Sequence, residues 1–330
     1  MTESSSTLKQ AFVLAAGLGT RLRPLTEELP KPLIPVGLKP LITFAFDHLV
    51  AELGVEEFIV NTHHCAEAYG EAFPTGEYRG RPVRLRHEPV LLDSAGGIRN
   101  IADLLDPAAG TLMVYNGDIL TDLPLAPALA RHRESGNEVT LILRSLDGPK
   151  HVAWDPVIGR VLDIRNLLGT GHTGGYALSC GYFVEPSFMA RIPAGGPASV
   201  IPIFLDMIRR GERIGGALAD EGQWRDLGTV PEYLRAHREL HAQGAGGFFP
   251  RYGAPDPAWR NWLHPTAQIA PDARLSGAYV VGPNARVGEG AILEDTILWP
   301  DAEIASGARL RNVIVRSSRV AAGSAADLVF

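Results

Sequence analysis

Residues 14–36 read LAAGLGTRLRPLTEELPKPLIPV, and they say more about fold and function than any other stretch of the chain. They follow a short apolar run that is typical of a buried strand. Because Gly17 and Gly19 carry no side chain, the backbone N–H groups of this loop can approach a ligand closely. Arg21 offers a planar fork of donors for phosphate oxygens, and Lys31 offers a point charge between two prolines that stiffen its base. The segment therefore predicts a polyphosphate site.

Two common phosphate-binding motifs do not fit this loop. The Rossmann pattern GxGxxG would need a third glycine where Leu22 stands, and the Walker pattern GxxxxGK[ST] is absent. What remains is GxGTR followed by PKP, which is longer and more specific. It resembles the signature of the sugar-1-phosphate nucleotidyltransferases, also called nucleotide-sugar pyrophosphorylases. The resemblance implies that the loop binds the nucleotide through Ala15, Ala16, Gly17, Gly19, Thr20 and Arg21.

Composition bounds the class of protein. The chain has 330 residues, enough for about two domains. A hydrophobic content of 45% fits a globular protein with a full core, and a net charge of −6 argues against a broad nucleic-acid surface. Cys65 and Cys180 lie far apart in the sequence and do not have the spacing of metal ligands, which favours thiols that are buried or have no functional role. The polar N-terminus and the short apolar run after it predict neither a signal peptide nor a membrane span, so the expected compartment is the cytoplasm.

Short apolar runs alternate with helical patterns from residue 11 to about residue 242. The expected strands are 11–15, 57–61, 82–87, 111–116 and 138–144, and the expected helices are 40–53, 97–105, 124–135, 198–210 and 230–241. Strands separated by helices predict an α/β domain with a mostly parallel sheet. The resemblance makes this a Rossmann-like mixed sheet of the nucleotidyltransferase type, similar to GT-A, and assigns residues 1–242 to the catalytic domain.

A second domain is expected after a linker rich in glycine and proline at residues 243–262. In residues 263–330, apolar side chains recur every six residues, with alanines two positions earlier and a one-residue deletion near Trp299. The apolar series is Ile269, Leu275, Val281, Val287, Leu293, Ile304 and Leu310. Such hexapeptide periodicity marks a parallel β-helix, and the resembling family carries the left-handed form. We expect this domain to make the protein a homo-oligomer.

Two aspartates are candidate ligands for Mg²⁺. Asp118, in YNGDIL, follows an expected strand, where a carboxylate beside a glycine can hold a divalent cation. A turn with a capping aspartate is the alternative. Asp226, in QWRDLGT, matches an aspartate that the resembling family carries in a W-x-D-x-G-T context. Since Mg²⁺ takes one or two protein carboxylates together with phosphate oxygens, the pair is expected to hold one or two Mg²⁺ ions.

The nucleobase is expected near residues 87–100, HEPVLLDSAGGIRN. Here Ser94 to Gly97 are interpreted as a small-residue turn that opens a helix at Ile98. In the resembling family a glycine-bearing stretch contacts the base, which implies Gly96 and Gly97. Glu88 lies where the family often places a polar side chain that reads the base, and its carboxylate would accept from guanine or from uracil. A surface glutamate after a strand is the alternative.

The sugar phosphate is expected at three positions. The resemblance implies Asn116 beside the metal aspartate and Gly181 in YALSCGYFV, where a glycine lets the sugar lie against backbone. A glycine in an apolar strand otherwise indicates a bulge. Many family members also carry a Glu-Lys-Pro lysine, which residues 159–166 lack. Arg165 is the candidate replacement, and a solvated surface arginine is the alternative.

The implied reaction joins a nucleoside triphosphate and a sugar 1-phosphate into a nucleotide sugar and pyrophosphate. In this hypothesis Arg21 and Lys31 are the catalytic residues, which hold the β/γ-phosphates and the α-phosphate. The β-helix favours guanylyl transfer to mannose 1-phosphate. Uridylyl transfer to a hexose or N-acetylmuramate 1-phosphate is the alternative, and so is a non-catalytic regulatory subunit. An acyltransferase is disfavoured because the tail is short and its one histidine, His264, lies at its start. Neither nucleic acid nor a membrane is an expected partner.

Overall fold

The computed structural model describes residues 7–146, 148–172, 174–243 and 262–330. The chain forms two compact units: unit 1 comprises residues 1–18 and 42–225, and unit 2 comprises residues 19–41 and 226–330. The expected linker at 243–262 lies almost wholly outside the described residues. The domain boundaries at 242 and 262 therefore stay a prediction. Among the described residues, no helix combines the length and the apolar character that crossing a membrane requires.

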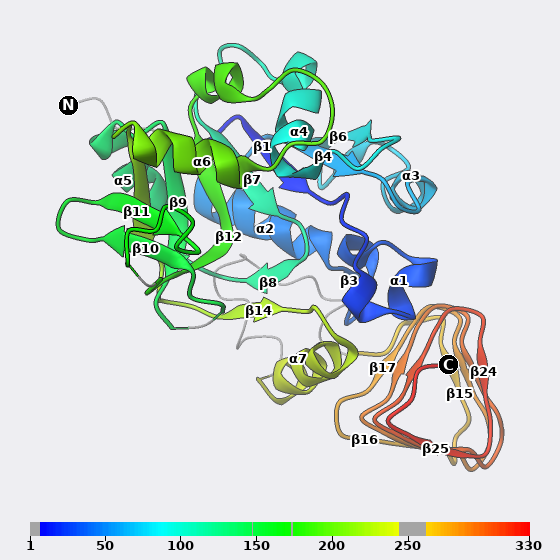
Figure 1. Cartoon of the computed structure of the whole chain (residues 1–330). Helices are drawn as coiled ribbons and strands as arrows, with labels where there is room; N and C mark the ends of the chain where they lie inside the picture. Colours follow the sequence, from blue (N-terminus) through cyan, green and yellow to red (C-terminus); the bar gives the residue numbers. More distant parts are fainter. Residues whose placement is uncertain (1–6, 147, 173, 244–261) are drawn as a thin grey trace. The chain divides into compact units, whose positions relative to one another are not determined.

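Unit 1 is built on one ten-stranded sheet, in the order β10-β11-β13-β9-β12-β7-β1-β4-β6-β5. Its strands are β1 (Gln10–Leu14), β4 (Glu57–Thr62), β5 (Glu77–Tyr78), β6 (Arg81–His87), β7 (Leu112–Asn116), β9 (Val139–Arg144), β10 (Val152–Asp155), β11 (Arg160–Ile164), β12 (Ala177–Val184) and β13 (Ile214–Leu218). Strands β7, β1, β4 and β6 run parallel, and β12 runs antiparallel between β7 and β9. The expected mostly parallel mixed sheet is confirmed (Figure 1).

Helices and short helical turns connect these strands. They are α2 (Ile42–Leu53), α3 (Glu67–Ala72), α4 (Asp93–Asn100), α5 (Ala126–Ser135) and α6 (Val200–Arg209), with the 3₁₀ turns η3 (Ala102–Leu104) and η4 (Pro186–Arg191). Helix α6 begins after Ser199, whose hydroxyl accepts from the N–H of Ile201 at 3.4 Å. Helix α5 ends at Gly136, which adopts the left-handed conformation. Side chains of α4 and α6 share one core with β1, β7, β9 and β12.

The prediction of a helix at 97–105, opened by a small-residue turn at 94–97, is wrong. Helix α4 already begins at Asp93 and ends at Asn100, and residues 102–104 form a separate 3₁₀ turn. Glycines are poor helix formers, which is why the sequence favoured a turn there. Packing requires them instead: a Cβ on Gly96 would lie 3.0 Å from the carbonyl oxygen of Gly196, and one on Gly97 would lie 3.1 Å from Glu88 Oε1.

A two-stranded ribbon of β8 (Ile119–Thr121) and β14 (Trp224–Asp226) completes this description. Within unit 1, the Thr121 hydroxyl donates to the carbonyl oxygen of Gln223 at 2.6 Å, and the N–H of Asp122 donates to the same oxygen at 3.2 Å. The Asp122 carboxylate in turn accepts from the N–H of Gln223 at 2.6 Å. These bonds fix the chain immediately before it enters unit 2.

Unit 2 starts with a compact N-terminal segment, residues 19–41. Its elements are the 3₁₀ turns η1 (Thr20–Leu22) and η2 (Lys31–Leu33), helix α1 (Leu25–Glu28) and the hairpin strands β2 (Pro35–Val36) and β3 (Lys39–Pro40). Helix α7 (Val230–Gln243) follows later in the chain. Thr229 and Glu232 form a capping pair at its start, since the Thr229 hydroxyl accepts from the N–H of Glu232 at 3.4 Å and donates to its carboxylate.

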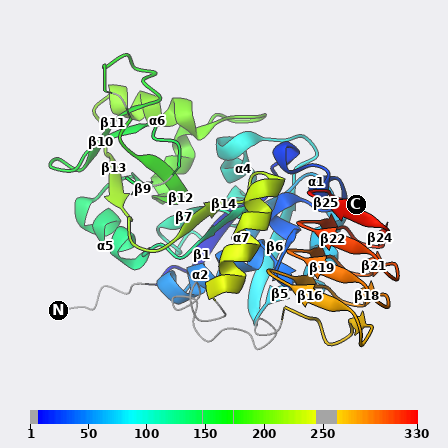
Figure 2. The same ribbon diagram turned by 90° about the horizontal axis from the view of Figure 1, so that it is seen from below.

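The rest of unit 2 is a β-helix of three parallel ladders, which Figure 1 shows end-on as nested triangles and Figure 2 shows from the side. The ladders are β15 (Gln268–Ile269), β18 (Arg286–Val287), β21 (Glu303–Ile304) and β24 (Val320–Ala321); β16 (Arg274–Ser276), β19 (Ile292–Glu294), β22 (Arg309–Arg311) and β25 (Ser324–Ala326); and β17 (Val280–Val281), β20 (Ile297–Leu298) and β23 (Ile314–Val315). The predicted hexapeptide β-helix is confirmed, and its handedness stays a prediction.

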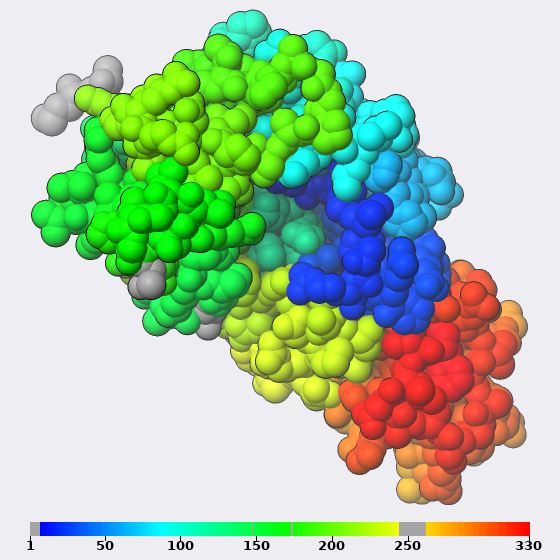
Figure 3. Space-filling view, viewed as in Figure 1, coloured from blue at the N-terminus to red at the C-terminus, as the bar shows by residue number. Residues whose placement is uncertain are grey.

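Stacked apolar side chains form the interior of the β-helix. Ile269, Val287 and Ile304 are paired in one ladder, and Leu275 pairs with Leu293 in another. Coil spacing shortens by one residue between Leu293 and the following strand β20, close to the expected deletion. The last residues, coloured red in Figure 3, pair with the preceding coil and pack Phe330 against this core.

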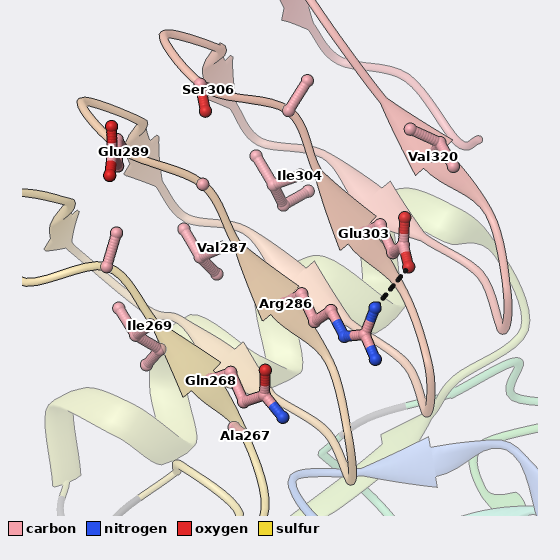
Figure 4. A pocket seen from close by; sticks show the side chains of 13 residues that line it. Ala267, Gln268, Ile269, Arg286, Val287, Glu289, Glu303, Ile304, Ser306 and Val320 are labelled. Carbon is pink, nitrogen blue, oxygen red and sulfur yellow. Dashed lines mark hydrogen bonds and ion pairs between the residues drawn. The ribbon is translucent and has the colours of Figure 1, made fainter.

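The outer side of the β15-β18-β21-β24 ladder is largely polar. Figure 4 shows Gln268, Arg286, Glu303 and Val320 along it, in a shallow groove. Arg286 NH1 lies 3.4 Å from Glu303 Oε1, one coil away. Exposed ion pairs of this kind contribute little to stability. The apolar interior therefore accounts for most of the stability of this part of the chain.

His237 ties α7 to the N-terminal segment of unit 2. Its Nε2 accepts from the N–H of Gly37 at 3.0 Å, so its Nδ1 carries the proton and donates to the carbonyl oxygen of Tyr233 at 2.9 Å. The ring is buried, and burial lowers the pKa of His237 to about 4, against a small opposing effect of the bond to Tyr233. The neutral imidazole is thus part of the fold.

This arrangement predicts acid sensitivity. Between pH 6.5 and 4 the unfolded histidine binds a proton that the folded one does not, so stability falls as the pH drops through that window. Between pH 7.5 and 5, the wild type should lose about 2 kcal/mol more unfolding free energy than His237→Gln, whose amide oxygen can still accept from Gly37. Denaturant unfolding at both pH values measures this. His172→Gln, at an exposed site, should keep the wild-type slope; equal slopes for His237→Gln and wild type would contradict the assignment.

Candidate active site

In unit 1 the ends of β1 and β7 lie side by side. Leu14 is in register with Asn116, and the N–H of Gly117 donates to the carbonyl oxygen of Leu14 at 3.0 Å. A Cβ on Gly117 would lie 2.8 Å from Val13 Cγ1, so this close approach requires glycine. The structure thereby brings the expected sugar-phosphate residue Asn116 and the expected metal ligand Asp118 beside the start of the glycine loop.

The start of that loop is fixed by two side chains. Asn61 Oδ1 accepts from the N–H of Ala15 at 2.7 Å, and the Tyr69 hydroxyl donates to its carbonyl oxygen at 2.9 Å. Burial raises the pKa of Tyr69, and the charge of Asp118 adds to the rise. The Ala15 N–H therefore already has a protein partner, and Ala16 is buried. Exposed backbone begins at Gly17, where a Cβ would meet nothing within 4 Å.

Glu88 is buried beside Asn61 in unit 1. Its Oε1 accepts from Asn61 Nδ2 at 2.8 Å, and its Oε2 accepts from the N–H of Leu92 at 3.0 Å. The alternative of a surface glutamate is wrong, because the side chain is fully buried. Both oxygens bind the protein, so the geometry favours a brace between β4, β6 and the start of α4. Base reading by Glu88, Gly96 and Gly97 stays a prediction.

Unit 2 gathers two cations around one carboxylate. Lys31 Nζ lies 2.8 Å from Asp226 Oδ1, and Arg21 NH2 lies 3.3 Å from Asp226 Oδ2. The lysine side chain is only 6% exposed and that of Arg21 is 68% exposed, so the first is part of the fold and the second faces solvent. The sequence predicts a stiff backbone around Lys31, and the 3₁₀ turn η2 between Pro30 and Ile34 holds the backbone of this lysine in place.

The ion pairs keep Asp226 charged. Burial raises the pKa of Asp226, but the charges and hydrogen bonds of Lys31 and Arg21 outweigh burial and hold it below its ordinary value. A phosphate that binds Lys31 and Arg21 would take over two partners of this carboxylate. The released oxygens would then be available to a divalent cation. The group is thus suited to bind a polyphosphate together with a metal ion.

Two glycines make room for these cations. A Cβ on Gly228 would lie 2.9 Å from Arg21 NH1 and 3.0 Å from its Cζ, so the guanidinium lies directly against Gly228. Gly19 adopts the left-handed conformation at φ +59°, and a Cβ there would lie 3.1 Å from Lys31 Cβ. The Thr26 hydroxyl donates to the Gly19 carbonyl oxygen at 3.0 Å. Thr20, the last expected loop contact, opens η1 and is exposed.

Comparison with known proteins matches this arrangement to a family. The nucleotidyl transferase family model matches residues 10–151. A mannose-1-phosphate guanylyltransferase of Mycobacterium tuberculosis is 31% identical over 304 residues, which cover 90% of this chain and 81% of that protein. The chain belongs to the sugar-1-phosphate nucleotidyltransferases.

Two further relatives extend over most of the chain. A UTP–glucose-1-phosphate uridylyltransferase of Synechocystis is 26% identical over 338 residues, covering 93% of this chain and 87% of that protein. A probable mannose-1-phosphate guanylyltransferase of Oryza sativa is 27% identical over 322 residues, covering 94% and 82%. These matches include the β-helix region, so this two-part construction is shared with relatives of the same family.

Two of the residues expected to bind the sugar phosphate in this nucleotidyltransferase, Asn116 and Gly181, lie on neighbouring strands. The third, Arg165, lies elsewhere along the sheet. Gly181 pairs with Tyr115, next to Asn116, across the β12–β7 pair. A Cβ on Gly181 would lie 2.0 Å from the Val114 carbonyl oxygen, and the register of β12 against β9 shifts between Leu178 and Tyr182, as the bulge interpretation predicts. Arg165 is exposed after β11, which β13, β9 and β12 separate from β7 in the sheet. Sugar-phosphate binding by these residues stays a prediction.

The carboxylates expected to bind metal belong to different units. Asp118 is in unit 1 and Asp226 begins the last segment of unit 2. Within the described ranges, no three histidine, cysteine or acidic side chains form a metal-binding group. One or two carboxylates with phosphate oxygens are an ordinary Mg²⁺ environment, so the donor chemistry of the two aspartates fits this ion.

Sequence reasoning missed Asn61, Tyr69 and Gly228. Asn61 is a polar residue near the carboxyl end of β4, directly after the apolar run 58–60, and ligands bind at the carboxyl ends of such strands, so its position was a usable signal. Gly228 lay within the quoted DLGT motif but its contact with Arg21 joins residues far apart in sequence. Tyr69 carried no such signal.

Gly228→Ala should displace the Arg21 guanidinium while leaving the fold intact. We expect the KM for the nucleoside triphosphate to rise roughly tenfold or more, since one charge-assisted contact is weakened. Steady-state kinetics of pyrophosphate release measures this. Gly70→Ala is the matched control, because a Cβ there meets nothing within 4 Å. An unchanged KM for Gly228→Ala would refute a role of the Gly228–Arg21 contact in nucleotide binding.

Proposed function

We propose that this chain is a mannose-1-phosphate guanylyltransferase, which forms GDP-mannose and pyrophosphate from GTP and mannose 1-phosphate. Two of the relatives described above carry that name, one of them at 31% identity. The observation that carries the chemistry is the arrangement of Lys31 and Arg21 on Asp226. It supplies one buried cation, one exposed cation and an ionised carboxylate for a triphosphate.

In this proposal the sugar phosphate is itself the nucleophile, so no general base is needed. One of its oxygens forms a bond to the α-phosphorus while the bond to the pyrophosphate oxygen breaks, and pyrophosphate leaves with the electron pair. Catalysis is then positioning and charge neutralisation. Arg21 would hold the β/γ-phosphates and Lys31 the α-phosphate. Asn116 and Gly181 would border the sugar phosphate, with Arg165 as the candidate replacement for the family lysine.

Asp118 and Asp226 would hold Mg²⁺. The ion would supply positive charge next to the phosphate oxygens, and the aspartates would fix where that charge lies. Exposed backbone at Gly17 and Thr20, and partly exposed backbone at Gly19, would contribute further N–H donors. Lys31 and Arg21 both pair with Asp226, which holds these cations close together, and a phosphate would compete with this carboxylate for them.

Uridylyl transfer is the second candidate, favoured by the relative from Synechocystis, which aligns with 93% of this chain. A regulatory subunit without activity is less well supported, because Arg21, Lys31, Asp118 and Asp226 are all present. A homo-oligomer formed through the β-helix and a cytoplasmic location are further parts of this proposal.

A substrate panel tests the proposal. We expect pyrophosphate release with Mg²⁺ to be fastest for GTP with mannose 1-phosphate among all pairs of five nucleoside triphosphates with several sugar 1-phosphates. UTP with glucose 1-phosphate is the informative competitor. A clear preference for a uridylyl pair would replace the guanylyl assignment, and release with no pair from folded protein would favour the regulatory subunit.

Lys31→Ala should lower kcat by roughly 100-fold or more, because one preorganised donor to the reacting phosphate is lost. The melting temperature should fall as well, because Asp226 keeps Arg21 but loses its buried partner, so kcat is compared at a temperature where both proteins are folded. Lys9→Ala, which removes an exposed lysine paired with Asp106, is the control for loss of a charge. Turnover of Lys31→Ala at the wild-type rate would exclude the assigned role.

A further inference from the structure

One corner of the β-helix carries three different residues in successive coils. Strands β17, β20 and β23 stack in register, so the residues that follow them, Gly282, Trp299 and Arg316, occupy equivalent positions. Trp299 is 1% exposed, and the Arg316 side chain is 14% exposed. An arginine this far from solvent on the outside of a coil must contact another part of unit 2, and both side chains do so.

Arg316 reaches the segment that carries Arg21. Its NH1 donates to the carbonyl oxygen of Pro24 at 3.1 Å and lies 3.7 Å from Glu27 Oε2. Its Nε donates to the carbonyl oxygen of Phe330 at 3.1 Å, which anchors the guanidinium on the β-helix side. The planar fork thus joins the β-helix to the turn that directly follows Arg21.

Trp299 is connected through Tyr233 to Pro35, which follows Lys31 in the chain. Its Nε1 donates to the Tyr233 hydroxyl at 3.2 Å, and that hydroxyl donates to the carbonyl oxygen of Pro35. Burial raises the pKa of Tyr233, so the hydroxyl keeps its proton and remains a donor. Pro35 follows the 3₁₀ turn of Lys31, and the two links therefore hold the N-terminal segment of unit 2 on both sides of this lysine.

We infer that the β-helix is a positioning element for the phosphate-binding cations, and that Arg316 is the residue through which it sets Arg21. Both cations lie in 3₁₀ turns of three residues, which are too short to be rigid alone. The carbonyl oxygen of Pro24 is bound by Arg316, and that of Pro35 is bound by Tyr233, which Trp299 holds. The stacked coils therefore limit the motion of both turns. This inference rests on the proposed function for its effect on rate, but its structural part does not.

Arg316→Ala tests the structural part without any substrate. Amides of residues 20–37 should exchange with deuterium several times faster, while those of α4 in unit 1 keep their wild-type rate. Arg309→Ala is the matched control, since Arg309 is exposed on the neighbouring strand β22 of the same coil. Equal exchange of residues 20–37 in wild type and Arg316→Ala overturns the inference, whatever the activity.

Kinetics tests the positioning part. Arg316→Ala should lower kcat/KM for the triphosphate roughly tenfold, since small displacements of a positioning group cost this much or more. The KM for the sugar phosphate should change little, and Arg316→Lys, with one donor centre in place of a fork, should recover part of the rate. A wild-type rate for Arg316→Ala despite faster exchange overturns the positioning role.

A double-mutant cycle separates positioning from general weakening of the fold. If Arg316 acts through Arg21, then Arg316→Ala should cost little further rate in an Arg21→Ala background. If the two substitutions lower the rate independently, so that their fold-losses multiply in the double variant, then Arg316 does not act through Arg21. If the proposed function fails, wild-type protein shows no turnover of GTP with mannose 1-phosphate while residues 20–37 remain protected. If the inference fails, wild-type turnover is normal and Arg316→Ala matches it.

Discussion

The ion pair between Lys31 and Asp226 is the constraint on which the arrangement of unit 2 depends. It joins residues 195 positions apart, and the lysine is almost completely buried. A buried charge without a partner is costly, so the N-terminal segment and the start of the last segment must fold together. Arg21 adds a second, exposed cation to the same carboxylate. The pair that stabilises this part of the protein is also the pair assigned to phosphate binding.

In unit 1, close backbone packing at glycines holds neighbouring elements together. Gly117 lets the ends of β1 and β7 meet, and Gly97 lets α4 lie against Asn61 and Glu88. A methyl group at either position would separate elements that hydrogen bonds now hold together, such as the bond between Gly117 and Leu14. Glycines that a family motif assigns to a ligand therefore also carry a packing role. A substitution at such a site changes both the framework and the ligand surface.

Periodicity in the sequence indicated the class of architecture, although the expected strands cover five of the ten in the sheet. Alternating strands and helices indicated the mostly parallel sheet, and the six-residue repeat indicated the β-helix with its deletion near Trp299. Failure came where local propensity and packing disagree: Gly96 and Gly97 were placed in a turn, but close contacts put them inside α4. Burial of Glu88 could not be predicted either, because its partner Asn61 comes from another strand.

The joining of Arg21, Lys31 and Asp226 in one group was implied by motifs but not derivable from spacing. Neither the motifs nor the periodicity predicted that a side chain of the β-helix contacts the segment that carries Arg21 and Lys31. A repeat fixes which side chains face inward and leaves the corner positions free to vary, and here these hold glycine, tryptophan and arginine in successive coils. Because neighbouring coils repeat the same backbone, a corner is a place where one residue can be exchanged without disturbing the stack. A solenoid beside a short, irregular binding loop thus supplies rigidity that the loop cannot provide for itself, at positions that evolution can adjust one at a time.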